Sequence, residues 1–150
     1  MKPLIVLLLS FVVSIFVVKW INKEYDFALS ARIAMSIMLV FTAIGHFAFT
    51  KGMSMMIPKF IPYKETFVYL TGLFEILLAI GLLIPRLKQF TGYTLIIFLV
   101  LMLPANIYSS INHVNYQKGT FDGHGLVYLW FRIPLQILFI IWTYICSIRI

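Results

Sequence analysis

Charged side chains are scarce in this 150-residue chain, where Asp, Glu, Lys and Arg together make up 11%. A water-soluble domain carries about 25% charged and about 45–50% apolar residues, whereas 62% of this chain is apolar. So short a chain cannot hide that much apolar surface, because a domain of its size leaves roughly a third of its chain surface in water. The composition excludes a soluble enzyme and a disordered chain, and it indicates that lipid solvates most of the surface.

Cysteine and acidic residues are scarcer still. Cys146 is the only cysteine, which excludes an internal disulfide, a disulfide-stapled module and a Cys-x-x-Cys redox pair. Five acidic residues stand against 12 basic ones, a formal net charge of +7. The basic residues lie singly or in pairs between apolar blocks, so we interpret them as anchors at lipid headgroups and expect no nucleic-acid partner. The sequence also lacks a glycine-rich phosphate loop, a haem-attachment motif and a nucleophile elbow.

Five apolar stretches occupy most of the chain: 3–21, 31–50, 66–84, 91–111 and 126–148. Each is close to the about 20 residues that a helix needs to cross about 30 Å of hydrocarbon. None alternates with the period of two that a membrane strand requires. The sequence therefore predicts an all-α integral membrane helix bundle with five spans. We expect 31–150 to form a four-helix transmembrane domain, and 1–30 to add an N-terminal transmembrane helix and its connection.

The N-terminal stretch has two interpretations. Lys2 and the apolar run 4–18 fit the basic and hydrophobic parts of a signal peptide. No cleavage motif of small residues follows, and the run ends in Lys-Trp-Ile-Asn-Lys at 19–23, which is typical of a helix end at a membrane interface. We therefore favour a retained helix.

Four of the polar residues inside the predicted spans stand out, because a charged side chain there costs at least about 2.5–3.5 kcal/mol. They are His46, Glu75, Asn106 and Arg132. A helix rises about 1.5 Å per residue, which puts all four side chains roughly 6–14 Å from the same membrane face. Four different helices thus bring an imidazole, a carboxyl, an amide and a guanidinium to a similar depth.

Each of these residues also belongs to a stripe of polar or small side chains on its helix. The stripes are Arg32, Ser36, Ala43 and His46; Thr71, Gly72, Glu75 and Ala79; Met102, Asn106, Ser110 and His113; and Tyr128, Arg132, Gln136 and Thr143. Small residues let neighbouring helices approach closely, and polar stripes that face one another form the interior of a bundle.

Two interpretations of this polar cluster are open. In the structural one, a Glu75–Arg132 ion pair fastens the helices, with hydrogen bonds from the neighbouring polar groups. In the functional one, His46 and Glu75 are catalytic residues that exchange protons beside a bound ligand. The ligand-binding residues are then Asn106, Arg132, Gln136 and Tyr128. Because the variety of groups exceeds what fastening requires, we favour a ligand pocket.

The connections 51–65 and 112–125 lie at the same predicted membrane face and could roof this pocket. The first is apolar but broken by prolines, so we expect it to lie in the interface rather than to span. Both connections contain side chains that can bind metals: Met53, Met55 and Met56 could bind Cu(I), and His113, Tyr116, Asp122 and His124 could bind another metal. Packing is the favoured role of the methionines and no fixed ligand spacing supports the second site, so we expect no metal.

Short motifs follow one another in a fixed order: Gly45-His46-Phe47, Met56-Ile57-Pro58 with Ile61-Pro62, Tyr69-Leu70-Thr71-Gly72-x-x-Glu75, Gly81-Leu82-Leu83-x-Pro85, Pro104-Ala105-Asn106-Ile107-Tyr108, Arg132-x-Pro134-Leu135-Gln136, and Trp142. In this ordered set the chain resembles the DoxX-like family of small four-helix membrane proteins, over about residues 31–148. The resemblance implies a four-helix bundle to which the N-terminal helix is an addition. The family takes its name from a subunit of an archaeal thiosulfate:quinone oxidoreductase, and other members are associated with membrane redox assemblies.

Our leading hypothesis is therefore a subunit or accessory of a redox system in the bacterial inner membrane. Its pocket would bind a quinone or a similar lipophilic molecule. The chain has no flavin or haem motif and no cysteine near the polar cluster, so we expect no intrinsic cofactor and a partner protein that carries the electrons. The alternatives are a lipid-modifying enzyme, such as a double-bond isomerase, and a non-catalytic membrane assembly protein.

Overall fold

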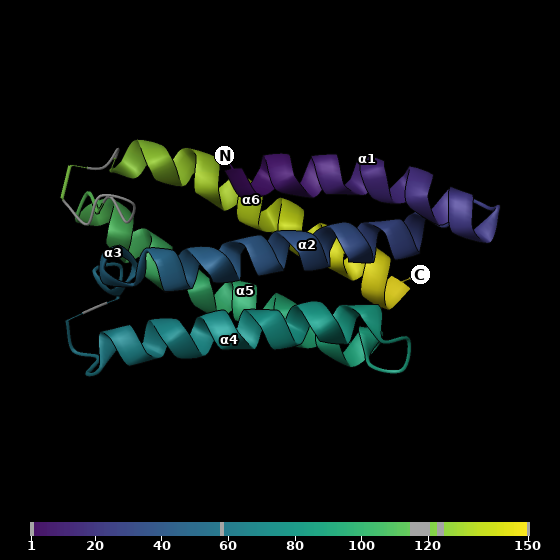
Figure 1. Ribbon diagram of the computed structural model, residues 1–150. Helices are drawn as coiled ribbons and strands as arrows, with labels where there is room; N and C mark the ends of the chain where they lie inside the picture. The colour runs from purple at the N-terminus through teal and green to yellow at the C-terminus, as the bar shows by residue number, and fades with distance from the viewer. Residues whose placement is uncertain (1, 58, 115–120, 123–124, 150) are drawn as a thin grey trace.

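The structure is a computed structural model that describes residues 2–57, 59–114, 121–122 and 125–149. Its elements are α1 (Lys2–Asn22), α2 (Phe27–Ala48), α3 (Thr50–Ser54), α4 (Lys64–Leu83), α5 (Lys88–Ile111), α6 (Leu126–Thr143) and the π-helix η1 (Tyr144–Arg149). The long helices run alternately in opposite directions along the bundle (Figure 1). Five of them are long and apolar enough to cross a membrane, which confirms the predicted all-α membrane bundle with five spans.

The helix α2 begins four residues before the apolar stretch that predicted it. Asp26 has extended backbone angles, and its carboxylate accepts a hydrogen bond of 3.0 Å from the backbone N–H of Leu29. The hydroxyl of Ser30 donates to the carbonyl oxygen of Asp26 at 2.8 Å. A side-chain acceptor at this position satisfies one of the free N–H groups of the first turn, so the cap rather than the hydropathy sets where the helix begins.

The centre of the bundle is α2, which packs most extensively on α4 and α1. The opposite side is completed by α5, which packs on α6, on η1 and on α4. The apolar core between these helices is made by Ala34, Met35, Met38, Leu39, Leu78, Ala79, Leu82, Leu95, Phe98, Leu99, Leu135 and Phe139, together with Leu7 of α1. Small residues recur in this set, as expected where close helix packing rather than water drives association.

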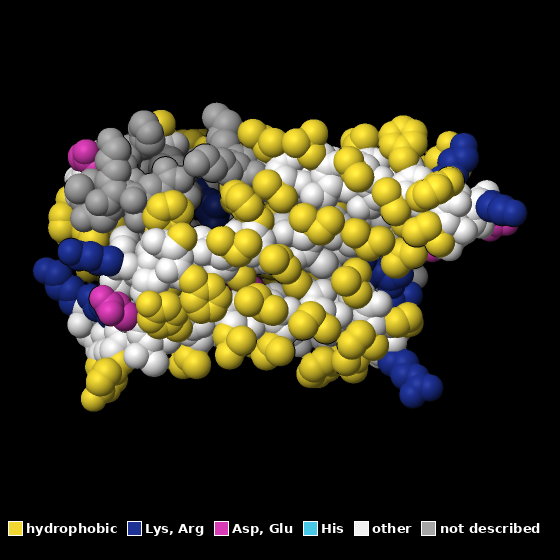
Figure 2. Space-filling model, viewed as in Figure 1, with side chains coloured by type: hydrophobic (Ala, Val, Ile, Leu, Met, Phe, Trp, Pro, Cys, Tyr) yellow, Lys and Arg dark blue, Asp and Glu magenta, His cyan; other side chains and the backbone are white. Residues whose placement is uncertain are grey.

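The outer surface is apolar along the helices and basic at the ends of the bundle. Figure 2 shows hydrophobic side chains over the length of the visible face, and Lys and Arg side chains gathered at its two ends. Large exposed apolar side chains occur on all five long helices, among them Leu9, Ile44, Leu70, Leu101 and Ile141. This is the distribution that a hydrocarbon belt between two headgroup layers requires.

The N-terminal helix α1 packs against α2 along one face. Leu7 on that face is fully buried, and the ring of Phe11 meets the ring of Trp142 edge to face with centroids 5.0 Å apart. The indole N–H of Trp142 donates to the carbonyl oxygen of Ala31 at 3.1 Å. These contacts connect α1, α2 and α6 on the side of the bundle away from α4 (Figure 1).

Candidate functional site

The site begins with two helix faces that meet at a glycine. Thr42 and His46 lie one turn apart on α2, and Thr71 and Glu75 lie one turn apart on α4. Between them is Gly72, where an added Cβ would lie 2.9 Å from the Cβ of His46. Only glycine allows this approach, and the approach brings the imidazole to the carboxyl.

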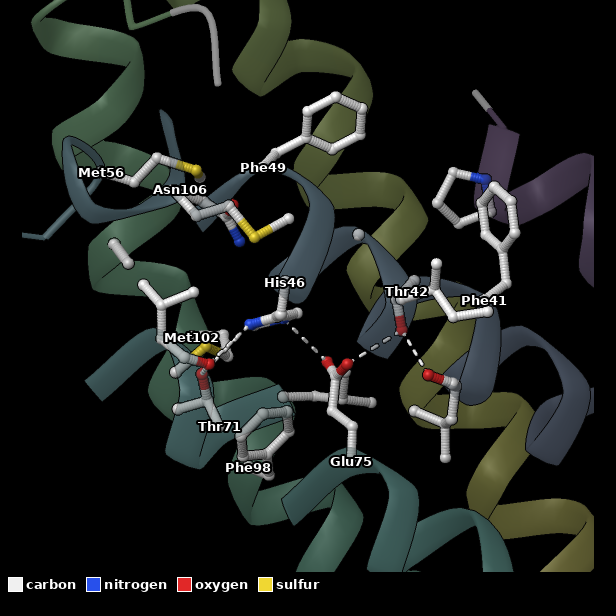
Figure 3. Close-up of a pocket in the computed structure, with 18 of the residues that line it drawn as sticks. Phe41, Thr42, His46, Phe49, Met56, Thr71, Glu75, Phe98, Met102 and Asn106 are labelled. Carbon is white, nitrogen blue, oxygen red and sulfur yellow. Dashed lines mark hydrogen bonds and ion pairs between the residues drawn. The ribbon is translucent and has the colours of Figure 1, made fainter. Parts of the chain in front are cut away.

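His46 and Glu75 form an ion-pair contact in the interior of the bundle. The Nε2 atom of His46 is 3.5 Å from Oε1 of Glu75 (Figure 3). Glu75 is only 7% exposed, so its carboxyl is held away from bulk solvent. The pair has two forms without net charge: imidazolium with carboxylate, and neutral imidazole with carboxylic acid. A pair of this kind is electrically neutral as a unit, which lowers the penalty of placing it at this depth.

The other side of the His46 ring has hydrogen-bond partners of its own. The Nδ1 atom is 3.2 Å from the carbonyl oxygen of Val68 and 3.2 Å from the hydroxyl oxygen of Thr71. The Thr71 hydroxyl itself donates to the Val68 carbonyl at 2.9 Å. A carbonyl oxygen can only accept, so the contact with Val68 is a hydrogen bond when Nδ1 carries the hydrogen. In the other tautomer Nδ1 accepts from the Thr71 hydroxyl, so Nδ1 has a partner in either form while Nε2 faces Glu75.

Thr42 contacts the second oxygen of the carboxyl. Its hydroxyl oxygen is 3.1 Å from Oε2 of Glu75 and 2.9 Å from the carbonyl oxygen of Leu39. The hydroxyl has one hydrogen and cannot donate to both oxygens at once. When Glu75 is ionised, the hydroxyl donates to Oε2; when Oε2 is protonated, it accepts from Glu75 and donates to Leu39. The site therefore accommodates both protonation states of the carboxyl.

These groups lie on the wall of a cavity of about 370 Å³. The volume is within the about 300–1,000 Å³ typical of small-molecule pockets. Nine of the 25 lining residues are aromatic or thioether: Met38, Phe41, Phe49, Met53, Met56, Phe67, Phe98, Met102 and Phe139. Figure 3 shows Met56, Met102 and Phe98 around the His46 ring, with Phe41 and Thr42 on the far side of Glu75.

The wall opposite the pair comes from α5 and α6. Asn106 on α5 and Gln136 on α6 are 4% and 2% exposed, and both line the cavity together with Arg132. The side-chain N–H of Gln136 donates to the carbonyl oxygen of Leu99 at 2.6 Å, which ties α6 to α5. Two atoms here, Nε of Arg132 and Oε1 of Gln136, are buried and have no hydrogen-bond partner among the residues that the structure describes.

The structure brings together in one cavity five of the six predicted site residues, namely His46, Glu75, Asn106, Arg132 and Gln136. The side chain of the sixth, Tyr128, lies outside the described residues. The Glu75–Arg132 ion pair of the structural interpretation is not present in the described part of the chain, where the ion-pair partner of Glu75 is His46. The reason is helix order, because α4 packs mainly on α2, whereas α6 packs on α5.

The connection 51–65 borders the cavity, as expected for a roof at that membrane face. Its first turn is the short helix α3, and Met53, Met56 and Ile57 all line the cavity. No cluster of three His, Cys, Asp or Glu side chains suited to a metal occurs within the described ranges. Tyr116 and His124 of the second predicted loop lie outside those ranges.

Sequence reasoning missed two parts of this site. Thr42 lies four residues before His46, so its helical spacing was a sufficient signal for the same face. Pro3 of α1 also lines the cavity, and no pattern in the sequence indicates that contact. The aromatic wall is equally hidden, because phenylalanines that face a cavity and those that face lipid look alike in an apolar helix.

A comparison with protein families finds one described as a domain of unknown function (DUF8561), whose model matches residues 35–147. The matched stretch extends from α2 to η1 and leaves α1 outside it. No curated protein and no solved structure matches the chain.

Proposed function

We propose that this chain, which belongs to the DUF8561 family, binds a quinone or a similar lipophilic ring compound in the cavity between α2, α4, α5 and α6. In this proposal it is a subunit or accessory of a membrane redox system. The observation that carries the proposal is the buried His46–Glu75 pair on the wall of an apolar cavity. A quinone that gains or loses electrons also gains or loses protons, and the pair is suited to exchange them.

The shape and lining of the cavity support a flat ring as the ligand. Its volume of about 370 Å³ suits a substituted ring and the first part of an apolar tail. Phe49 and Phe98 offer aromatic surface to such a ring, and Met53, Met56 and Met102 offer flexible thioethers that adapt to its substituents. Because the outer surface faces lipid, a lipophilic ligand is also concentrated around the protein.

The redox role rests on the resemblance to the DoxX-like family. That resemblance suggests a partner protein that carries the electrons, because the chain itself has no flavin or haem motif. In this proposal His46 and Glu75 move protons, while Asn106, Arg132 and Gln136 contact polar atoms of the ring. We place the complex in the bacterial inner membrane, where quinones and their redox partners occur together.

The proposal is tested by ligand-dependent stabilisation of the purified full chain in detergent or lipid nanodiscs. We expect a short-tailed quinone to raise the melting temperature, since a ligand that binds only the folded state stabilises it by about 2.7 kcal/mol at 100 times its Kd. The variants Glu75→Gln and His46→Ala should reduce that shift, because each removes one half of the proton-exchanging pair.

The matched control is Glu65→Gln, which makes the same chemical change at an exposed position in the first turn of α4. It should leave the shift unchanged. A wild-type chain whose melting temperature does not respond to any quinone would overturn the proposed function. Equal shifts in the wild type and in both pair variants would show that His46 and Glu75 take no part in quinone binding.

A further inference from the structure

The part of the cavity formed by α6 has two polar atoms without partners. Nε of Arg132 and Oε1 of Gln136 are both buried, and neither has a hydrogen bond within the described ranges. A buried polar atom left unpaired costs free energy, so each such atom in a folded protein asks for an explanation. Both side chains line the cavity, so a bound molecule can supply the missing partners.

The two atoms differ in what they can accept or donate. Nε of Arg132 carries a hydrogen and is a donor only. The amide of Gln136 has its orientation fixed, because the contact of 2.6 Å with the carbonyl oxygen of Leu99 requires an N–H on that side. The free atom of Gln136 is therefore its carbonyl oxygen, which is an acceptor only.

The unpaired donor and acceptor belong to the same face of one helix. Arg132 and Gln136 are four residues apart on α6, so their side chains project from the same face of the helix in successive turns. A ligand oxygen between them would have to accept from Arg132 and, through its own hydrogen, donate to Gln136. A hydroxyl group does both.

A carbonyl or a carboxylate fits this arrangement less well. Either can accept from Arg132, but neither has a hydrogen for Oε1 of Gln136, which would stay buried and unpaired. Asn106, on the neighbouring helix, offers both a donor and an acceptor and so favours neither form. The preference therefore comes from Gln136.

We propose that the cavity selects ligands with a hydroxyl-bearing head, and so binds a quinol or a phenol in preference to the corresponding quinone. The inference rests on the proposed function and adds the chemical form of the ligand to it. The shared chemistry is a lipophilic hydroxyl, which has two sources in a membrane: the reduced ring of a quinol and the end of an isoprenoid alcohol.

The test compares four ligands on the purified full chain in nanodiscs, under anaerobic conditions. They are a short-tailed quinone, its reduced quinol, a redox-inactive phenol with the same tail, and an isoprenoid alcohol. We expect the quinol and the phenol to bind at least about tenfold more tightly than the quinone, because they have a hydroxyl for the buried oxygen of Gln136 and the quinone does not. This ratio of affinities is measured on the wild-type chain, so the result does not depend on whether a variant folds.

The variant Gln136→Met keeps the length of the side chain and removes its amide. It should reduce the preference for quinol over quinone towards unity. The matched control is Gln89→Met, the same change at an exposed position near the start of α5, which should keep the preference.

Each outcome separates the two proposals. If none of the four ligands binds, the proposed function is wrong. If the quinone binds as tightly as the quinol and the phenol, the function stands and the selection by Gln136 is wrong. If the alcohol binds and the three ring compounds do not, the hydroxyl subsite stands, and its ligand is an alcohol lipid rather than a quinol.

Discussion

At the scale of single residues, the site depends on one glycine that carries no chemistry of its own. Gly72 lies between Thr71 and Glu75 in sequence and faces His46 across the contact between α2 and α4. The distance between imidazole and carboxyl follows from the absence of a Cβ there. A residue with no functional group thus controls the geometry of the His46–Glu75 pair.

We predict that Gly72→Ala weakens both folding and ligand binding. The new Cβ would lie 2.9 Å from Cβ of His46, closer than side-chain carbons approach, so α2 and α4 must separate or the His46 ring must move. Overpacking of this kind costs about 1–3 kcal/mol. Thermal unfolding with and without quinone measures both effects.

Gly45→Ala is the matched control on the facing helix. A Cβ at Gly45 would meet Cε of Met53 at 3.6 Å, which is an ordinary van der Waals contact. This variant should fold as the wild type does. Because Gly45 also lines the cavity, the comparison uses thermal unfolding without ligand. If Gly72→Ala and Gly45→Ala behave alike, the close approach at Gly72 does not determine the site.

At the scale of helices, the bundle relies on a second close approach between α4 and α5. An added Cβ at Gly81 would overlap the side chain of Thr91, including its Cγ2 at 3.0 Å. Thr91 is buried near the start of α5, just after the short turn that follows α4. This contact holds together the two helices that form adjacent walls of the cavity.

Gly81→Ala should therefore destabilise the bundle by about 1–3 kcal/mol. A double-mutant cycle identifies the cause, because Thr91→Ala removes Oγ1 and Cγ2 and leaves room for the new methyl group. We expect the double variant to recover most of the melting temperature lost in Gly81→Ala alone. Additive losses in the double variant would mean that Thr91 is not the obstacle.

At the scale of the whole molecule, lipid takes the place that water has around a soluble fold. The helix α1 illustrates this, because most of it faces outward, yet Leu7 is fully buried and Leu9 is 63% exposed on the same helix. Lipid solvates a leucine side chain about as well as a protein core does. Burial of Leu7 therefore stabilises the bundle through van der Waals packing and not through removal of apolar surface from water.

We predict that Leu7→Ala destabilises the chain and that Leu9→Ala does not. The loss at Leu7 should be smaller than the about 2–5 kcal/mol of a Leu→Ala change in a water-soluble core, since the cavity term remains while the transfer term largely disappears. Reversible unfolding in detergent mixtures measures the difference. Equal effects at the two positions would mean that α1 does not pack on the bundle in the membrane.

Much of this molecule follows from the chain alone. The low charge content and the five apolar stretches determine a helical membrane bundle, because lipid offers no partner for an unpaired backbone group. The rise and period of a helix determine the depth and the face of His46, Glu75, Asn106 and Arg132, since both are properties of one helix at a time.

Only the tertiary structure decided which of those residues are partners. Depth and face do not say which helices are neighbours, and a Glu at the right level can pair with any cation that an adjacent helix presents. Because α4 packs on α2 through Gly72, Glu75 pairs with His46, and because α6 packs on α5, Arg132 does not form the ion pair of the structural interpretation. That helix order gives the cavity the His46–Glu75 pair on one wall and the unpaired polar atoms of Arg132 and Gln136 on another.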